Sequence, residues 1–224
     1  MTLGNKSINP LHFPNVGVLE VTLTDEAFDF VKQCIQDKGN SLSKTLVGNI
    51  DSSYKLHDKD NWFYDNVLKE NVNHYSHYFR NLGSSVPTTK KHDYVLSSWW
   101  VNYQKKHEFN PVHDHTGLYS FVIWVKIPTE FKKQHDIQIK KGINPLGAVA
   151  GDFEFEYTNI IGKHCSFVYN MGQYIEGKMV FFPSVLKHCV YPFYECDEER
   201  VSVSGNICLG TVSYTHLTLP TRRF

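Results

Sequence analysis

Residues 110–117 of this chain read Asn-Pro-Val-His-Asp-His-Thr-Gly, and residues 181–188 read Phe-Phe-Pro-Ser-Val-Leu-Lys-His. Side chains two positions apart in a β-strand project from the same face, so His113 and His115 can bind one metal ion. His188, on the strand predicted for the second stretch, would supply a third ligand. This spacing predicts a metal site between two distant strands of a β-barrel.

The ligand set has two readings. Three protein ligands that leave one face of the metal open suit a mononuclear Fe(II) oxygenase, because dioxygen and an organic co-substrate must both coordinate. The common version of that site has two histidines and one carboxylate, and here His115 occupies the carboxylate position. A set of three histidines is favoured. Asp114 is the alternative ligand if the segment forms a loop.

Arg200 and Ser202 follow the third histidine on a segment that alternates polar residues with Val201 and Val203. In a strand this pattern directs Arg200 and Ser202 to one face and both valines to the other. A guanidinium offers a planar fork of donors that matches a carboxylate. The alternative is a surface salt bridge with the acidic residues of 195–199, but the alternation favours an inward carboxylate site.

The period of the apolar residues is helical before residue 84 and strand-like from residue 94 onward. Helices are predicted over 24–38 and 61–82, with a loop over 39–60. Strands are predicted over 16–23, 94–103, 118–127, 152–157, 165–169, 178–182 and 200–204. This pattern predicts an α+β, mainly β fold, a jelly roll with N-terminal helices packed on the sheet.

We expect one domain over residues 1–210, with helical support at about 24–83 and a jelly-roll core at about 94–210. The stretch 129–150 is long for a connection between strands, which indicates a mobile or functional insertion such as a lid. Residues 211–224 include a string that a sequencing adaptor would encode, so we expect a non-native tail there.

Composition narrows the class of protein. The 23 basic and 23 acidic residues balance, which does not support binding to bulk nucleic acid. The five cysteines form no Cys-x-x-Cys pair, and no apolar run is long enough for a membrane span. We therefore expect a cytoplasmic protein, in the host cytoplasm if it is viral, with reduced cysteines and no membrane partner.

Four segments together resemble a known family: Trp100-Val-Asn-Tyr103, His113-Asp-His115, Phe182-Pro-Ser with His188, and Glu199-Arg-Val-Ser-Val-Ser-Gly-Asn206. They are similar to the 2-oxoglutarate and Fe(II)-dependent oxygenases of prolyl-hydroxylase-like type, particularly an uncharacterised group from bacterial and phage genomes. The resemblance covers roughly residues 94–207.

The resemblance implies a double-stranded β-helix, with Fe(II) held by His113, His115 and His188. It also implies that Arg200 and Ser202 bind the distal carboxylate of 2-oxoglutarate, and that Asn102 and Asn206 help to hold this co-substrate. Dioxygen and an unidentified substrate would be the other partners, and hydroxylation the default reaction.

Aromatic residues on the predicted strands are candidate substrate contacts, with Trp100, Tyr103 and Trp124 foremost, although such residues more often lie in a core. Two other functions stay open at this point. One is a non-catalytic jelly roll whose histidines hold structural zinc. The other is a structural or interaction module, such as a viral component, with incidental histidines. The substrate and the oligomeric state do not follow from the sequence.

Overall fold

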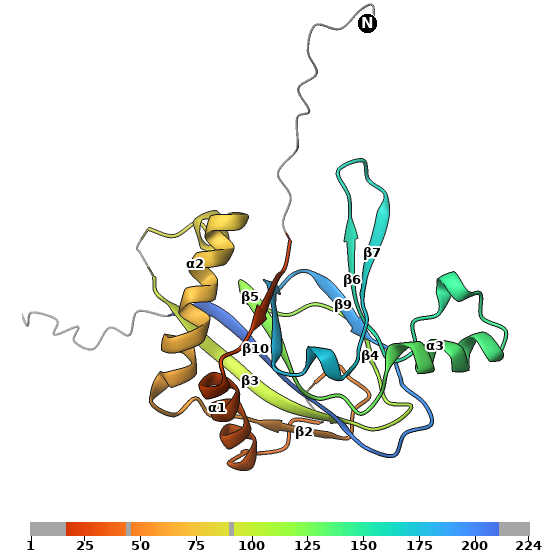
Figure 1. Ribbon diagram of the computed structural model, residues 1–224. Coiled ribbons are helices and arrows are strands. Elements are labelled where there is room, and N and C mark those ends of the chain that lie inside the picture. Colours follow the sequence, from red (N-terminus) through yellow and green to blue (C-terminus); the bar gives the residue numbers. More distant parts are fainter. Residues whose placement is uncertain (1–16, 44–45, 90–91, 211–224) are drawn as a thin grey trace, which may run out of the picture.

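The computed structural model describes residues 17–43, 46–89 and 92–210, and its strands form two antiparallel sheets (Figure 1). The larger sheet has the order β1 (Leu19–Thr22), β8 (Lys178–Pro183), β5 (Tyr119–Lys126), β10 (Arg200–Leu209), β3 (Tyr94–Gln104) and β2 (Ser52–Lys55). The smaller has the order β4 (Asn110–His113), β9 (Lys187–Val190), β6 (Phe153–Thr158) and β7 (His164–Tyr169). The prediction of a mainly β fold is confirmed, whereas the tail predicted over 211–224 lies outside the described residues.

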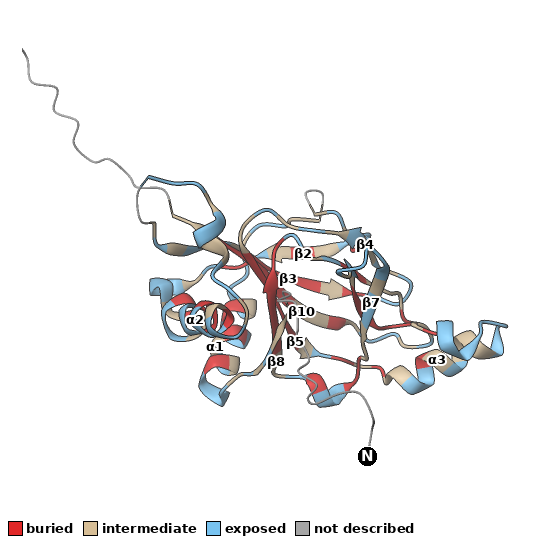
Figure 2. Ribbon diagram, turned by 90° about the horizontal axis from the view of Figure 1, so that it is seen from above, coloured by how far each residue is buried: buried red, intermediate tan, exposed pale blue. Residues whose placement is uncertain are grey.

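The larger sheet is buried on both faces. One face packs into a cluster with the helices and includes Trp99, Phe121 and Val203. The other face carries Trp124 and Phe182, which pack with Phe153 and Phe155 of the smaller sheet. Strands covered on both sides therefore appear buried along most of their length in Figure 2.

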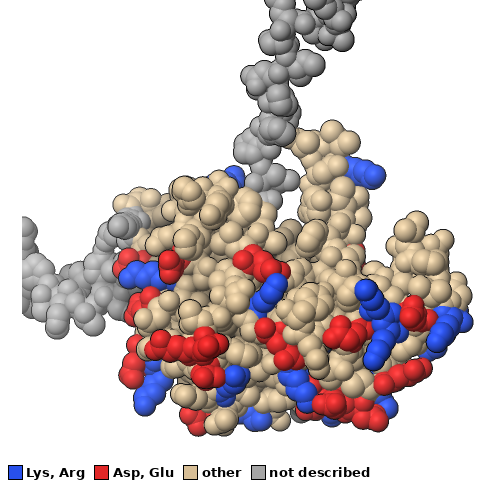
Figure 3. Space-filling model, viewed as in Figure 1, with Lys and Arg blue, Asp and Glu red and all other residues tan. Residues whose placement is uncertain are grey.

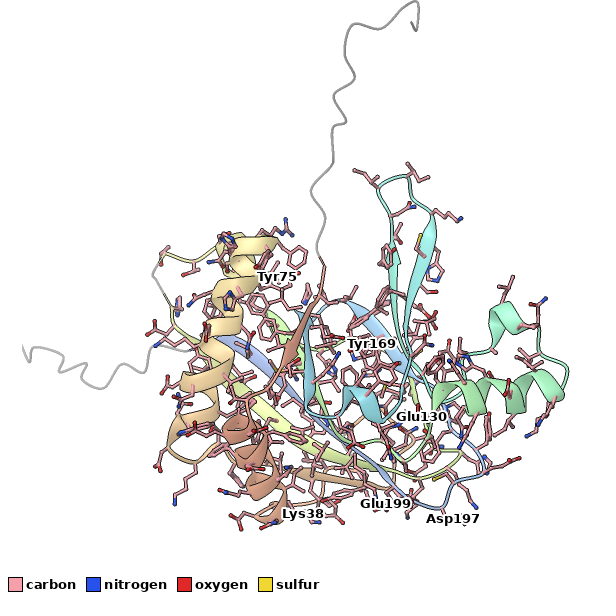
Figure 4. All side chains as sticks on the ribbon, viewed as in Figure 1. Lys38, Tyr75, Glu130, Tyr169, Asp197 and Glu199 are labelled. Atoms are coloured by element: carbon pink, nitrogen blue, oxygen red, sulfur yellow. The ribbon has the colours of Figure 1, made fainter. Side chains whose placement is uncertain are left out.

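The helices α1 (Asp25–Gln36) and α2 (Lys69–Tyr78) lie along the outer face of the larger sheet (Figure 1). Thr24 begins α1, because its hydroxyl accepts a hydrogen bond from the backbone N–H of Ala27 at 3.2 Å. Tyr75 points from α2 toward the sheet (Figure 4), where its ring centroid lies 5.3 Å from that of Tyr119 and 6.2 Å from that of Phe181. Aromatic contacts thus join the helical layer to the strands.

The second helix is shorter than the prediction over 61–82. A 3₁₀ turn (Lys59–Asn61) and a π-helical turn (Tyr64–Leu68) precede α2, and further 3₁₀ turns lie at Leu82–Ser85, Pro145–Gly147 and Gln173–Ile175. The carboxylate of Asp58 accepts hydrogen bonds from the backbone N–H groups of Phe63 and Tyr64, and so fixes the start of the segment. The apolar period alone shows neither this cap nor the change from π-helical to α-helical turns within the segment.

Two segments differ in kind from their predictions. The predicted loop 39–60 contains β2, an edge strand of four residues whose sequence is too short to show alternation. The predicted insertion 129–150 contains α3 (Phe131–Lys140), which has one buried residue, Gln134. Because α3 is fixed by polar side chains rather than by an apolar stripe, the sequence lacks the helical pattern.

The face of the molecule seen in Figure 3 shows no separation of charge. Lysine and arginine alternate there with aspartate and glutamate over the lower part of the molecule. Within the described residues, every helix is too short or too polar to cross a membrane.

Candidate metal centre

Three histidines meet where β4 and β9 pair. His113 and His188 are directly opposite each other in the antiparallel register of these strands. His115 lies two residues beyond the end of β4, and its backbone N–H donates to the carbonyl of Ser184 at 2.9 Å. Strand alternation therefore does not place His115, contrary to the prediction; the hydrogen bond to the β8–β9 turn does.

The strand predicted over 181–188 is also interrupted. It divides into β8 and β9, with a turn over 184–186 between them. The turn allows His188 to face β4 while its neighbour Cys189 lies on the opposite side of β9, where its thiol approaches Glu154. Cys189 thus faces away from the histidines, because adjacent side chains of a strand project to opposite faces.

The ligand atoms of His113, His115 and His188 all lie within 4.8 Å of one another. Their ring centroids are 4.4 Å apart for His113 and His188, 4.9 Å for His113 and His115, and 5.0 Å for His115 and His188. Asp114, the alternative ligand, is exposed and is not part of this group. A single ion between three imidazoles fits this arrangement.

Backbone contacts orient two of the rings. Nδ1 of His113 lies 2.7 Å from the carbonyl oxygen of Pro111, and Nδ1 of His188 lies 2.9 Å from that of Leu186. A carbonyl only accepts hydrogen bonds, so each Nδ1 must carry the proton. Nε2 of both rings then keeps its lone pair, as metal coordination requires.

Burial keeps two of the three rings neutral. It lowers the pKa of His188 to about 3 and that of His115 to about 4, with the nearby His113 as the next cause in both. Near neutral pH both rings are therefore unprotonated, the form that binds a metal ion. Imidazole donors suit Fe(II), but they also suit zinc, copper and nickel.

The histidines open into a cavity of about 450 Å³ between the two sheets. Strands β3 and β10 supply alternate polar residues to its wall: Ser98, Asn102 and Gln104 from β3, and Arg200, Ser202, Ser204 and Asn206 from β10. Their neighbours Val201 and Val203 pack in the cluster under the helices. The predicted inward face of residues 200–204 is present in the structure.

Arg200 is a buried cation that keeps one donor free. The side chain is 2% exposed; Nη2 donates to the carbonyl of Gly151 at 2.6 Å, and Nη1 donates to Oε1 of Gln104 at 3.4 Å. Among the described residues, Nε has no hydrogen-bond partner and no carboxylate forms an ion pair with this guanidinium. Burial lowers the pKa of Arg200 to about 10 while Asp152 raises it, so the group stays charged at neutral pH. A buried charge with a free donor fits an anionic ligand.

The alternative role for Arg200, a surface salt bridge, does not occur. Asp197 and Glu199 lie on the surface before β10 (Figure 4). Asp197 pairs instead with Lys106, and Glu198 pairs with Lys126. The acidic run thus binds surface lysines and leaves Arg200 inside the cavity.

The two predicted asparagines both line the cavity. Oδ1 of Asn102 accepts a hydrogen bond from Ser53 at 2.7 Å, and Oδ1 of Asn206 accepts one from Ser120 at 2.8 Å. Asn206 also donates to Ser98 through Nδ2 at 3.2 Å. The amide of Asn206 is therefore largely engaged by protein groups, whereas Nδ2 of Asn102 has no hydrogen-bond partner within the described part of the chain.

The three predicted substrate contacts lie in different environments. Trp100 lines the cavity, and its ring centroid is 5.7 Å from that of His115. Trp124 also lines it, but is 1% exposed and stacks on Tyr169. Tyr103 lies on the other face of β3, where it contacts Lys38, and it does not line the cavity. Alternation along β3 separates Tyr103 from Trp100.

Sequence reasoning missed one wall of the cavity. Residues of the predicted loop line it: Leu42, Leu46, Val47, Gly48 and Ile50. A Cβ atom added to Gly48 would lie 1.7 Å from Oδ1 of Asn110, so the backbone of this wall lies directly against β4. The sequence did contain a signal for this wall, because four large apolar residues lie within the otherwise polar stretch 42–50. Ser53, Gln104 and Gly151 were likewise missed.

Comparison with known proteins gives one family match. Residues 98–206 match the family described as "Putative 2OG-Fe(II) oxygenase". No curated protein matches the chain.

Three solved structures are similar in fold. A prolyl-4-hydroxylase from Pseudomonas putida is 13% identical, with 88% of this chain and 94% of that chain covered and a TM-score of 0.49. A viral collagen prolyl hydroxylase from Paramecium bursaria Chlorella virus-1 is 13% identical (85% and 94% covered, TM-score 0.45). An oxidoreductase of the 2OG-Fe(II) oxygenase family from Burkholderia pseudomallei is 12% identical (86% and 84% covered, TM-score 0.47). At these TM-scores the likenesses support no further statement about this chain.

Proposed function

We propose, from the premise that residues 98–206 belong to the family of 2OG-Fe(II) oxygenases, that this chain hydroxylates a substrate with Fe(II), 2-oxoglutarate and dioxygen. We interpret its two sheets as a double-stranded β-helix supported by α1 and α2. His113, His115 and His188 would hold the iron. The proximity of the three rings supports this assignment, as do the free Nε2 atoms of His113 and His188.

The observation that carries the proposal is the free Nε of Arg200, a buried cation in the same cavity as three imidazoles. The distal carboxylate of 2-oxoglutarate would accept hydrogen bonds from Arg200 and from Ser202, which lies two residues along the same strand face. Asn102 would add a donor through its amide. A carboxylate bound there is shielded from water, which strengthens a charge-assisted pair.

When bound, Fe(II) with 2-oxoglutarate supplies the activation of dioxygen, coupled to release of succinate and carbon dioxide. The chain's own part is to hold both groups in one orientation and to exclude water. Phe153 and Phe182 pack against His188, with ring centroids 5.4 Å and 5.1 Å from its ring. These rings restrict His188 to one position and keep that side of the centre dry.

The substrate would enter beside Trp100, whose ring lies next to His115. Asp114 and the apolar residues Leu46 and Val47 also line this cavity. We propose Trp100 as a substrate contact. Trp124 is enclosed by other side chains and would shape the co-substrate site instead.

A zinc-binding module is the second candidate, because three imidazole donors suit zinc as well as iron. Zinc binding by the three histidines would not require a buried, partly unpartnered arginine in the same cavity. The two candidates therefore differ in whether the chain binds 2-oxoglutarate.

The test is an anaerobic titration of the full chain with Fe(II) and 2-oxoglutarate, followed by the visible charge-transfer band, with succinate then measured in air. His188→Ala should abolish the band, and Arg200→Ala should weaken 2-oxoglutarate binding while Fe(II) still binds. His74→Ala, at an exposed position on α2, is the matched control. If the wild type shows no band and releases no succinate but binds zinc, the oxygenase function is rejected and the zinc-binding function is supported.

A further inference from the structure

Helix α3 contacts the backbone around Arg200 through polar side chains on one face. The amide of Gln134 forms two hydrogen bonds with the backbone of Tyr194: Nε2 donates to the carbonyl at 2.9 Å, and Oε1 accepts from the N–H at 2.8 Å. One turn later, Oε1 of Gln138 accepts from the N–H groups of Val149 and Ala150 at 2.7 Å and 2.8 Å. Two glutamines therefore fix two distant stretches of backbone to one helix.

A third residue of this helix binds a buried carboxylate. Nε2 of His135 lies 2.6 Å from Oδ2 of Asp152, which is 0% exposed. The same oxygen accepts from Nδ2 of Asn170 at 3.0 Å, and Oδ1 accepts from the backbone N–H of Met171 at 3.1 Å. Asp152 makes no ion pair with Arg200 among the described groups.

The backbone held in this way encloses the guanidinium. The carbonyl of Gly151, between the two anchored positions, accepts from Nη2 of Arg200, and the N–H of Gly151 donates to the carbonyl of Pro192 at 2.9 Å. Its φ of +77° favours glycine, and a Cβ there would lie 3.4 Å from Nη2. Phe193 places its ring 5.2 Å from the guanidinium carbon. Nothing in 129–150 lines the cavity, so this insertion is a support rather than the lid that its length suggested.

We propose that α3 is a positioning element for the co-substrate, and that His135 and Asp152 are positioning residues that keep Arg200 available to the carboxylate of 2-oxoglutarate. This inference rests on the function proposed above. The physical reason is competition, because Asp152 directly follows Gly151, whose carbonyl accepts a hydrogen bond from Nη2 of Arg200. Without His135, the buried carboxylate of Asp152 loses a hydrogen-bond partner. Rotation toward the guanidinium of Arg200 would then be favourable, because it would pair the buried charge. An internal ion pair would then occupy the donors that the co-substrate needs.

The experiment compares 2-oxoglutarate binding in variants of the full chain under anaerobic, Fe(II)-saturated conditions. His135→Ala should bind 2-oxoglutarate about tenfold more weakly, the effect of one lost charge-assisted hydrogen bond. His135→Gln keeps an N–H donor and should recover most of the affinity. Asp136→Ala changes the exposed neighbouring residue on α3 and should bind like the wild type.

A second pair tests the same element if His135→Ala does not fold. Gln138→Leu removes the acceptor for Val149 and Ala150, whereas Gln138→Glu keeps an oxygen that accepts both N–H groups. Gln138→Leu should raise the KM for 2-oxoglutarate with little change in kcat, and Gln138→Glu should not. Fe(II) affinity should stay unchanged in all of these variants, since the histidines lie on other elements.

The outcomes separate the two proposals. If the wild type binds 2-oxoglutarate and both His135→Ala and Gln138→Leu match it, α3 is not a positioning element and the oxygenase function stands. The positioning role is also refuted if these variants lose Fe(II) and 2-oxoglutarate affinity together, since that indicates general disruption. If the wild type binds no 2-oxoglutarate, both proposals fail.

Discussion

The two ends of the cavity are held in different ways. At the metal end, His113 and His188 are each oriented by a carbonyl two residues earlier in the chain. At the other end, Arg200 contacts Gly151 and Gln104, which are 49 and 96 residues away. A locally held ligand resists changes elsewhere in the fold, whereas Arg200 depends on distant segments being in place. The metal end should therefore tolerate distant substitutions that damage the Arg200 end.

The largest expected effect is the loss of metal binding when one of the three histidines is substituted. His188→Ala removes one of three ligands and should lower Fe(II) affinity by more than about 100-fold, beyond the effect usual for residues that only support a ligand. Metal should raise the Tm of the wild type by mass action, and should leave the Tm of His188→Ala unchanged. Calorimetry with and without Fe(II) or Zn(II) measures this difference. An equal metal-induced rise in both proteins would show that the ion binds elsewhere.

The second prediction concerns the Arg200 end. Arg200→Lys keeps the charge but loses the planar fork, so 2-oxoglutarate affinity should fall by roughly 10- to 100-fold. The metal-induced rise in Tm should stay as in the wild type, because Arg200 does not contact the histidines. Isothermal titration with each ligand separates the two effects. If Arg200→Lys lowers the affinity for 2-oxoglutarate and for the metal alike, the two ends of the cavity are not independent.

This difference also explains how much could be predicted from the sequence. The spacing of His113 and His115 and the alternation around Arg200 are local patterns, and both indicated side chains that the structure brings into one cavity. Strand register then decided details that local pattern does not contain: His115 is placed by the carbonyl of Ser184 rather than by alternation. Trp100 and Tyr103 were not distinguished because only the phase of the strand separates their faces.

The supports were missed for a different reason. Gln134 and His135 fix α3 by hydrogen bonds to specific backbone and carboxylate groups. A hydrogen bond between residues far apart in sequence leaves no periodic signal, whereas an apolar stripe does. The apolar wall around Val47 was hidden likewise, because its residues fall within a loop that bridges to Phe109, next to β4, only in the folded chain.

A third, smaller effect is expected at that wall. Gly48→Ala would bring Cβ against the side chain of Asn110, so the wall or β4 must shift. The free energy of unfolding should fall by about 1–3 kcal/mol, the usual cost of inserting atoms into a packed site. Gly147→Ala is the control, because the nearest atom to its added Cβ lies 3.9 Å away. Denaturant unfolding of both variants makes the comparison, and equal stabilities would show that residues 46–50 readily move.

The smallest effect is expected for Tyr103, and it distinguishes the two faces of β3. Tyr103→Phe removes a hydroxyl that accepts a hydrogen bond from the exposed Lys38, so stability should change by less than about 0.5 kcal/mol and 2-oxoglutarate turnover should not change. Trp100→Phe, on the cavity face, should alter 2-oxoglutarate turnover with Fe(II) affinity kept. Succinate release measured for both variants tests the contrast. A turnover defect in Tyr103→Phe equal to that of Trp100→Phe would mean that the helix-facing side of β3 also contributes to the reaction, and would restore Tyr103 to the site.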